Sequence, residues 1–270
     1  MSSVLVTGPF DELGSRELRF LQEASRFGGL TVLLWPDSAI VRHLGRTPRF
    51  PESEREYVLK AMRYVSRVER LSDVSDPDHL PQAFGGDLNS WVDMVSTANA
   101  KRKDHCRTRG LEYRVLEASA LAGFPVSPAA PFSVKKKVVV TGCFDWLHSG
   151  HIRFFEEVSG YGDLFVVVGH DANIRLLKGP GHPHFPQEER RYLVGSVRHV
   201  SQALISSGAG WLDAEPEIER LRPDIYAVNE DGDQGGKREF CESRGIEYLV
   251  LNRAPAPGLP QRTSTELRGF

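Results

Sequence analysis

An internal repeat constrains the fold of this chain more than any other feature. The stretch "VLVTGPFDELGSRELRF" (4–20) returns as "VVVTGCFDWLHSGHIRF" (138–154). An offset of about 135 residues is far longer than the repeat of a solenoid, so it indicates a duplicated domain. The same offset relates two more pairs of segments, 50–71 with 185–205 and 101–116 with 235–251.

Each copy alternates strand-like and helix-like segments. In the second copy, apolar β-branched runs at 137–142, 163–169 and 224–229 are separated by helical patterns at 150–158 and 187–197. Continuous apolar strands divided by helices are typical of a parallel sheet covered on both faces. We therefore predict an α/β fold with two tandem doubly wound, Rossmann-like parallel-sheet domains of about five strands each. Ligands are expected at the carboxyl ends of the strands.

Composition sets the domain boundaries and the class of protein. The 270 residues suffice for two small domains, and the Pro- and Ala-rich segment 125–135 is the natural linker between 1–124 and 136–270. With 40% apolar and 26% charged residues, the chain resembles ordinary soluble globular proteins. Its formal net charge of −2 provides no basic field for nucleic acid, although a phosphate site needs only local donors.

The cysteines and the apolar runs indicate a cytoplasmic protein. Cys106, Cys143 and Cys241 form no CxxC pair, so we predict neither disulfides nor a zinc site. A reduced, cytoplasmic compartment fits that pattern. The N-terminus lacks a basic region followed by a long apolar stretch, which argues against a signal peptide. No apolar run reaches the ~18 residues of a membrane span.

Two histidines stand where the first strand of the second copy turns into a helix. Gly150, between His148 and His151, lets an anion approach the backbone, and the N–H groups of a helix start favour negative charge. This arrangement predicts a polyphosphate site. The plain alternative is a pair of capping or solvent-facing histidines. A metal site of HxxH type is disfavoured because no glutamate lies within the pair and no third ligand is near, so we assign no metal ligands.

Four segments in order carry a resemblance to a known family. "GCFDWLHSGH" (142–151) resembles the HxGH signature of the nucleotidyltransferase superfamily, in its cytidylyltransferase branch. Three further segments resemble segments of that family in the same order. In the first, a lysine precedes a helix with acidic residues and an arginine. The second is acidic and ends a strand, and the third is the hydroxyl-rich start of a C-terminal helix. These are "LLKGPGHPHFPQEERRYLVGSVRHVSQAL" (176–204), "YAVNEDGD" (226–233) and "RTSTELRG" (262–269). The likeness covers essentially all of 136–270.

The resemblance implies roles for individual residues. His148 and His151 would contact the nucleotide phosphates, and Lys178 would bridge the acceptor phosphate and the nucleotide. Arg190 would hold the triphosphate. Arg253 or Arg262 would supply a further guanidinium, and the sequence does not choose between them. The remaining nucleotide-binding residues implied by the family are Gly142, Cys143, Phe144, Asp145, Gly150, Asn229, Asp231, Thr263, Ser264 and Thr265.

Plain alternatives stand beside several of these roles. Lys178 could be a solvated loop residue, and Arg190 could pair with a glutamate on its own helix. Asp231 could be a turn residue, and the hydroxyl group at 263–265 could be a helix cap. His182 and His184 are expected in a loop.

The resemblance further implies an enzyme that transfers CMP from CTP to a phospho-alcohol, sugar phosphate or phosphonate and releases pyrophosphate. Mg²⁺ is expected on the triphosphate, with few protein carboxylate ligands. ATP as donor and a sugar phosphate as acceptor is the nearest alternative, and a nucleotide-binding regulator without turnover is another.

The first copy lacks the residues of this site. Gly14 stands in place of His148, Glu17 in place of His151, and Leu44 or His43 in place of Lys178. A glutamate at a phosphate-facing helix start repels a triphosphate. We therefore interpret 1–124 as a degenerate, inactive copy that forms an intramolecular pseudo-dimer with the active one. A separate binding domain for a regulator is the alternative, and homo-oligomers remain open.

Overall fold

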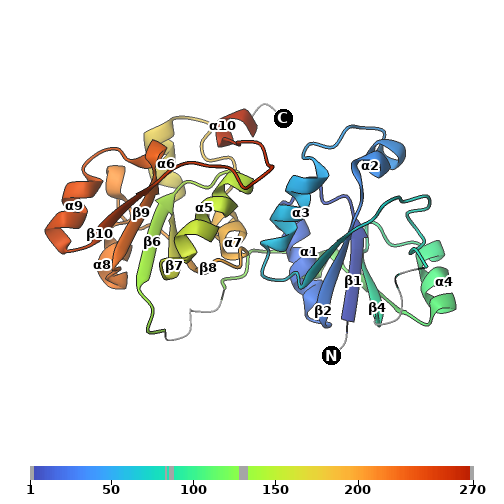
Figure 1. Cartoon of the computed structure of the whole chain (residues 1–270). Coiled ribbons are helices and arrows are strands. Elements are labelled where there is room, and N and C mark those ends of the chain that lie inside the picture. Colours follow the sequence, from blue (N-terminus) through green and yellow to red (C-terminus); the bar gives the residue numbers. More distant parts are fainter. Residues whose placement is uncertain (1–2, 83, 85–87, 128–132, 268–270) are drawn as a thin grey trace. The chain divides into compact units, whose positions relative to one another are not determined.

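The computed structural model describes residues 3–82, 84, 88–127 and 133–267, without the side chains of Thr265 and Glu266. It divides into unit 1, Met1–Gly123, and unit 2, Phe124–Phe270 (Figure 1). The middle of the linker expected at 125–135 lies outside the described residues. Phe124, just before it, belongs to unit 2, where its ring packs 6.3 Å from the ring of Tyr192.

The described residues of unit 1 form a five-stranded parallel sheet in the order β3-β2-β1-β4-β5. Helices lie in every connection between consecutive strands except the β3–β4 connection, where the described residues contain none, and one short 3₁₀ turn follows β5. The strands are β1 (Ser3–Gly8), β2 (Gly29–Leu34), β3 (Arg67–Arg70), β4 (Ser90–Met94) and β5 (Glu112–Leu116). The helices are α1 (Ser15–Ser25), α2 (Asp37–Leu44), α3 (Glu52–Lys60), α4 (Ala100–Arg109) and η1 (Ala118–Leu121).

The described residues of unit 2 form a second five-stranded parallel sheet in the order β10-β9-β6-β7-β8. Its strands are β6 (Lys137–Gly142), β7 (Asp163–Val168), β8 (Val200–Ile205), β9 (Ile225–Asn229) and β10 (Glu247–Leu251). Its helices are α5 (Ser149–Ser159), α6 (Asp171–Lys178), α7 (Gln187–Gly195), α8 (Glu215–Leu221), α9 (Lys237–Arg244) and α10 (Ser264–Leu267). Two 3₁₀ turns, η2 (Gly210–Leu212) and η3 (Glu230–Gly232), complete it.

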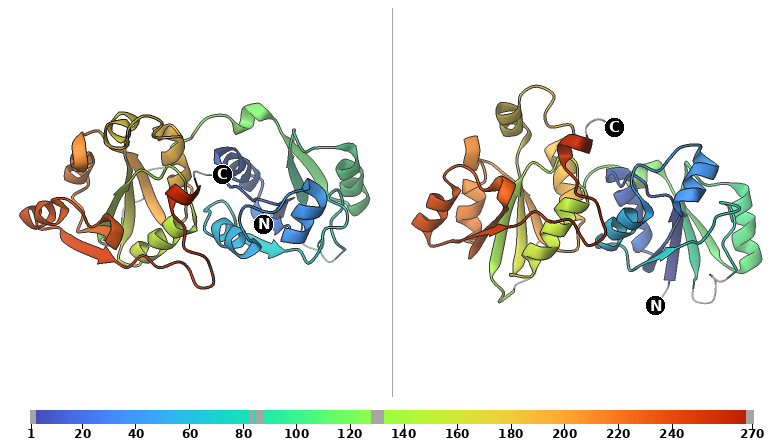
Figure 2. Two further views of the ribbon diagram at one scale, coloured as in Figure 1. Left: turned by 90° about the horizontal axis from the view of Figure 1, so that it is seen from above. Right: turned by 45° about the horizontal axis from the view of Figure 1, so that its top comes forward.

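The two sheets have the same topology. Counted from the first strand of each unit, both run 3-2-1-4-5, and helices lie on both sides of each sheet (Figure 2). The predicted α/β, doubly wound, two-domain fold is therefore confirmed. In this order the connections reverse direction between the first and fourth strands, which are β6 and β9 in unit 2. A crevice forms outside the carboxyl ends of the strands at such a switch point, and that is where ligands bind.

The apolar runs seen in the sequence form the centre of each sheet. Val138 and Val139 of β6 are fully buried and pair in parallel with Leu164 and Phe165 of β7. Continuous burial on both faces explains why these strands lack polar alternation. No helix within the described ranges is long and apolar enough to cross a lipid bilayer.

The turn after the first strand is tight in both units. Phe144 takes a positive φ of 52°, and Phe10, at the same place in unit 1, takes 41°. The ring of Phe144 folds back over Gly142, where a Cβ atom would lie only 2.8 Å from the ring. Glycine at position 142 is therefore required by the packing of the Phe144 ring.

Candidate functional site

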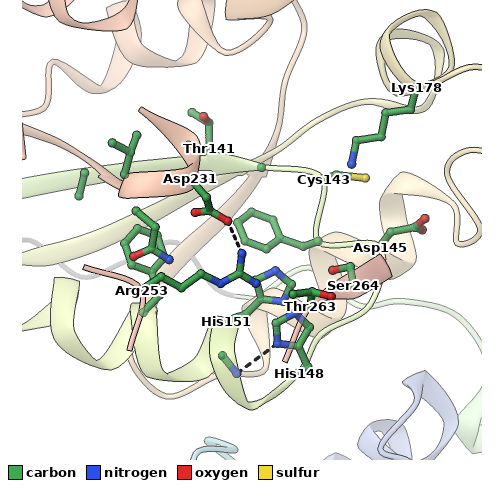
Figure 3. A pocket seen from close by; sticks show the side chains of 18 of the residues that line it. Thr141, Cys143, Asp145, His148, His151, Lys178, Asp231, Arg253, Thr263 and Ser264 are labelled. Atoms are coloured by element: carbon green, nitrogen blue, oxygen red, sulfur yellow. Dashed lines mark hydrogen bonds and ion pairs between the residues drawn. The ribbon is translucent and has the colours of Figure 1, made fainter. Parts of the chain in front are cut away.

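A pocket of about 320 Å³ opens at the carboxyl ends of β6 and β9 (Figure 3). It lies at the predicted switch point and gathers residues from the β6–α5 turn, the end of α6, the segment after β9 and the C-terminal segment. Of the residues predicted for nucleotide binding or catalysis, the pocket is lined by Gly142, Cys143, Phe144, Asp145, His148, Gly150, His151, Lys178, Asn229, Asp231, Arg253, Thr263 and Ser264.

His148 caps helix α5 with its side chain. Its Nδ1 accepts a hydrogen bond from the Gly150 N–H at 3.1 Å, so Nδ1 carries no proton and the neutral ring is protonated at Nε2. Nε2 is buried and has no hydrogen-bond partner among the described residues. A buried N–H group without an acceptor is energetically costly, so a ligand that offers an acceptor to this atom is favoured. Gly150 permits the arrangement, because a Cβ there would lie 3.0 Å from the His148 ring.

His151 stacks on His148 with ring centroids 3.8 Å apart and planes inclined by 25°. It hydrogen-bonds the backbone of Trp146, and its Nδ1 is buried without a partner among the described residues. Burial and the nearby Arg253 lower the pKa of His151 to about 3. Burial, and then the neighbouring His151 and arginines, lower the pKa of His148 to about 2. Both rings are therefore neutral near pH 7 when the pocket holds no anion.

Cationic side chains surround the two imidazoles. Lys178, the last residue of α6, extends toward the pocket (Figure 3). Lys237 lies at the start of α9, donates to the Gly232 carbonyl at 2.7 Å, and has its pKa lowered by burial. Arg253 pairs with Asp231 and donates to the Arg262 carbonyl at 2.8 Å. The described residues of the pocket wall thus include three basic side chains, one of which, Arg253, is paired with an exposed carboxylate.

The structure separates the two arginines that the sequence left undecided. The side chain of Arg253 lines the main pocket, whereas Arg262 lines a smaller cavity beside it, together with Phe154 and Asn252. The hydroxyl residues Thr263 and Ser264 follow Arg262 and line the main pocket. The backbone of Thr265 continues into α10, and its side chain lies outside the described residues.

Arg190 lies beneath the pocket, which corrects the prediction that it holds the triphosphate. It is fully buried and outside the pocket lining. Its guanidinium donates to the carbonyls of Phe185, Cys143 and Gly169 at 2.9, 2.6 and 2.8 Å, and it pairs with Asp171 at 2.7 Å. With these bonds made, the side chain ties the β6–α5 turn to the start of α7 instead of facing a ligand.

Sequence reasoning missed six residues of the pocket wall. Lys237 opens an otherwise ordinary helix, and no motif marks it; only its place after β9, at the switch point, could have identified it. The others are apolar or small residues whose contribution depends on the fold: Thr141, Phe154, Ala227, Val228 and Gly232.

The same place in unit 1 is built differently. The Glu17 carboxylate folds back on its own helix and accepts the Gly14 N–H at 3.2 Å, so it occupies the anion-binding end of α1. A pocket of about 610 Å³ lies there, walled by aromatic residues such as Phe10, Phe20 and Trp35. A fixed carboxylate at the helix start makes this pocket unsuited to a polyphosphate.

Comparison with known proteins agrees with the geometry of unit 2. The model of the family described as "Cytidylyltransferase-like" matches residues 139–268. A protein named FAD synthase from Ferroglobus placidus is 37% identical over 119 residues, which are 43% of this chain and 74% of that protein. The chain belongs to the cytidylyltransferase-like family. Its second unit is thus a nucleotidyltransferase domain.

Other relatives of this cytidylyltransferase-like chain are larger or more distant. A bifunctional protein HldE from Alcanivorax borkumensis is 34% identical over 118 residues, 43% of this chain and 24% of that protein. The chain therefore spans about a quarter of that relative. A solved lipopolysaccharide core biosynthesis protein from Thermoplasma volcanium covers 45% of this chain and 98% of its own, at 25% identity and a TM-score of 0.38. A superposition that loose adds nothing to the assignment.

Proposed function

We propose that unit 2 transfers a nucleotidyl group from a nucleoside triphosphate to the phosphate of a small acceptor and releases pyrophosphate. The observation that carries the proposal is His148 Nε2, a buried donor without a partner among the described residues, in a pocket walled by basic side chains. Phosphate oxygens are the acceptors that satisfy such a donor.

The basic residues of the pocket lie on different sides of the space that the anionic substrates would occupy. Lys178 and Lys237 stand on opposite connections, after β7 and after β9, so a triphosphate between them meets positive charge from two sides. Thr263 and Ser264 offer hydroxyl donors from the C-terminal segment. The N–H groups at the start of α5 add the favourable end of a helix dipole.

The chemical step needs no general base. An acceptor phosphate already carries an anionic oxygen, which forms a bond to the α-phosphorus while the bond to the pyrophosphate oxygen breaks in line. The electron pair of that bond leaves with pyrophosphate. Catalysis then rests on positioning the two anions and on stabilising the charge that grows on the α-phosphate oxygens. Neutral His148, with its proton on Nε2, donates to one of those oxygens.

His151 contributes through a change of protonation. The neutral ring donates from its other nitrogen to the backbone of Trp146, so Nδ1, which has no partner among the described residues, bears a lone pair and cannot donate to a phosphate in that state. A bound triphosphate adds negative charge beside the ring and raises its pKa from about 3. We propose that His151 takes up a proton on binding the triphosphate and then donates from Nδ1.

Mg²⁺ fits this pocket as an ion carried by the triphosphate. The two carboxylates of the wall are engaged, because Asp231 pairs with Arg253 and Asp145 accepts backbone N–H groups. Mg²⁺ keeps several waters and takes few protein ligands at nucleotide sites. When bound, it neutralises part of the phosphate charge. Asp231, the exposed carboxylate of the wall, would be the residue to hold it.

The proposal has two forms, which differ in the nucleobase of the triphosphate. The lysine before Gly179–Pro180, the acidic-arginine helix and the "RTSTEL" segment favour CTP by resemblance. ATP is the second candidate, because relatives of the chain are named FAD synthase. The acceptor stays open among phospho-alcohols, sugar phosphates, phosphonates and flavin mononucleotide.

Release of pyrophosphate tests the function. We expect release from one of CTP and ATP with at least one phosphorylated acceptor, and none when that acceptor is replaced by its unphosphorylated form. Release with ATP only would replace the CTP form. No release with any pair, together with tight nucleotide binding, would refute the enzyme and favour a nucleotide-binding regulator.

For unit 1 we propose no nucleotidyl transfer. Glu17 occupies its helix start, and no histidine stands at the positions of His148 and His151. A pseudo-dimer with unit 2 remains the prediction for its role, and a regulator-binding domain remains the alternative.

A further inference from the structure

Three side chains of residue types that commonly bind metal ions lie close together beside the pocket of unit 2. Asp145 lies in the β6–α5 turn, and His182 and His184 lie in the connection between α6 and α7. One ligand atom from each lies within 4.8 Å of the other two. Asp145 is 2% exposed, and its Oδ2 lies 3.9 Å from the Nδ1 atom of His182. The imidazole rings of His182 and His184 meet edge to face at 5.6 Å.

The corresponding carboxylate in unit 1 shows what this cluster lacks. Asp11 accepts the N–H groups of Arg49 and Phe50, each at 3.0 Å, and forms an ion pair with Arg46. A buried carboxylate is costly unless a positive charge compensates it. In unit 1 a guanidinium supplies that charge.

In unit 2 the backbone anchor is kept, but the guanidinium is gone. Asp145 accepts the His184 and Phe185 N–H groups at 2.8 and 3.1 Å. Within the described ranges, no lysine or arginine forms an ion pair with it. The loop "GRTPRF" (45–50) of unit 1 becomes "GPGHPHF" (179–185), so two imidazoles replace the arginines.

We propose that Asp145, His182 and His184 bind a divalent transition-metal ion of the Zn²⁺ or Co²⁺ class. Two imidazole nitrogens and one carboxylate oxygen suit these ions, whereas Mg²⁺ prefers oxygen ligands alone. The ion supplies the positive charge that Arg46 supplies in unit 1. This site is separate from the Mg²⁺ of the triphosphate and reverses the expectation that the chain has no metal ligands and no zinc site.

The geometry permits the binding with small side-chain movements. Ligand atoms at ~2.0–2.1 Å from a tetrahedral ion lie roughly 3.4 Å apart, so separations of up to 4.8 Å must close by at most about 1.4 Å. His184 is exposed, so its ring can turn toward the ion, and the half-buried His182 already has its Nδ1 3.9 Å from Asp145 Oδ2. Three protein ligands leave one position of a tetrahedral ion open.

The ion would fasten the α6–α7 connection to the β6–α5 turn. Lys178 ends α6 at the start of that connection, and Asp145 itself lines the nucleotide pocket. The metal is therefore a positioning element for Lys178. Its binding does not depend on the proposed nucleotidyl transfer, so either claim can fail alone.

Co²⁺ alone, without nucleotide, is the probe. Equilibrium dialysis of the full chain should retain one Co²⁺ per chain in the presence of millimolar Mg²⁺, with visible d–d absorption that reports its ligands. His182→Ala and His184→Ala should each weaken binding by at least the 10–100-fold typical of losing a metal's outer-shell partner. Asp145 is left intact because it also anchors backbone N–H groups.

His79→Ala is the matched control, since it removes an exposed histidine that lies beside Asp76 in unit 1. It should leave the cobalt stoichiometry and spectrum unchanged. The proposal is overturned if no Co²⁺ is retained, if Mg²⁺ displaces it, if both cluster variants bind as the parent does, or if His79→Ala loses the metal equally.

Discussion

The two units share a fold and differ at one helix start. In unit 2, His148 and His151 line the pocket, and each has a buried nitrogen without a hydrogen-bond partner in the part of the chain that the structure describes. In unit 1, Glu17 turns its carboxylate back onto the Gly14 N–H. The sheet order is the same in both, so the fold does not need the histidines. The comparison separates residues that serve the fold from residues that serve the proposed chemistry.

The arginines beneath the two turns belong to the fold. Arg55 donates to the carbonyls of Phe50, Pro9 and Trp35 and pairs with Asp37, which is the network of Arg190 repeated in unit 1. Unit 1 has this arginine but neither histidine, so the arginine serves the fold of both units.

The largest expected effect follows from this pair of arginines. Arg190→Ala and Arg55→Ala should each lower the free energy of unfolding by about 3–5 kcal/mol, because each leaves three backbone carbonyls without their donor. Urea denaturation followed by circular dichroism measures this. If Arg190→Ala kept the parental stability and only raised the nucleotide KM, the structural role given to Arg190 would be wrong.

The next effect concerns the histidine that distinguishes the units. His148→Ala should reduce the rate of pyrophosphate release by on the order of 10²–10³-fold, the cost of losing one donor to a developing oxyanion. Glu17→Gln in unit 1 is the matched control and should leave the rate unchanged. Equal loss in both variants would remove the functional contrast between the units.

A smaller effect should appear in the pH dependence of stability. Unfolding returns the pKa of each histidine from about 2 or 3 to its ordinary value of about 6.5, so the unfolded chain binds protons first as the pH falls. The free energy of unfolding therefore keeps the full contribution of the two neutral rings above about pH 6.5. It loses that contribution as the pH falls from there toward the folded pKa values of about 2 and 3.

Between pH 7.5 and pH 5.5, each ring should therefore cost about 1.4 kcal/mol of unfolding free energy. Urea unfolding of the parent and of the His148→Asn/His151→Gln double variant measures the difference, and asparagine keeps a cap for α5. The variant should lose less stability on acidification. Equal losses would mean that the two rings are not held neutral.

Motif spacing identified most of the pocket, because a signature places residues relative to a strand end and a helix start. His148, His151 and Lys178 were found in this way, and the alternating apolar runs predicted both sheets. Arg190 was misjudged because a sequence shows charge but not burial. Lys237 was missed because its role depends on where β9 ends in space. The choice between Arg253 and Arg262 depended on a loop without a regular pattern.

The asymmetry between the units is tested most directly by the stoichiometry of nucleotide binding. Isothermal titration of the full chain with Mg·CTP and with Mg·ATP, without acceptor, should give one site per chain for the nucleotide that the protein uses. That site should weaken strongly in His148→Ala and stay unchanged in Glu17→Gln. Two equivalent sites per chain, or one site that survives the loss of His148 and disappears with a change in unit 1, would contradict the account.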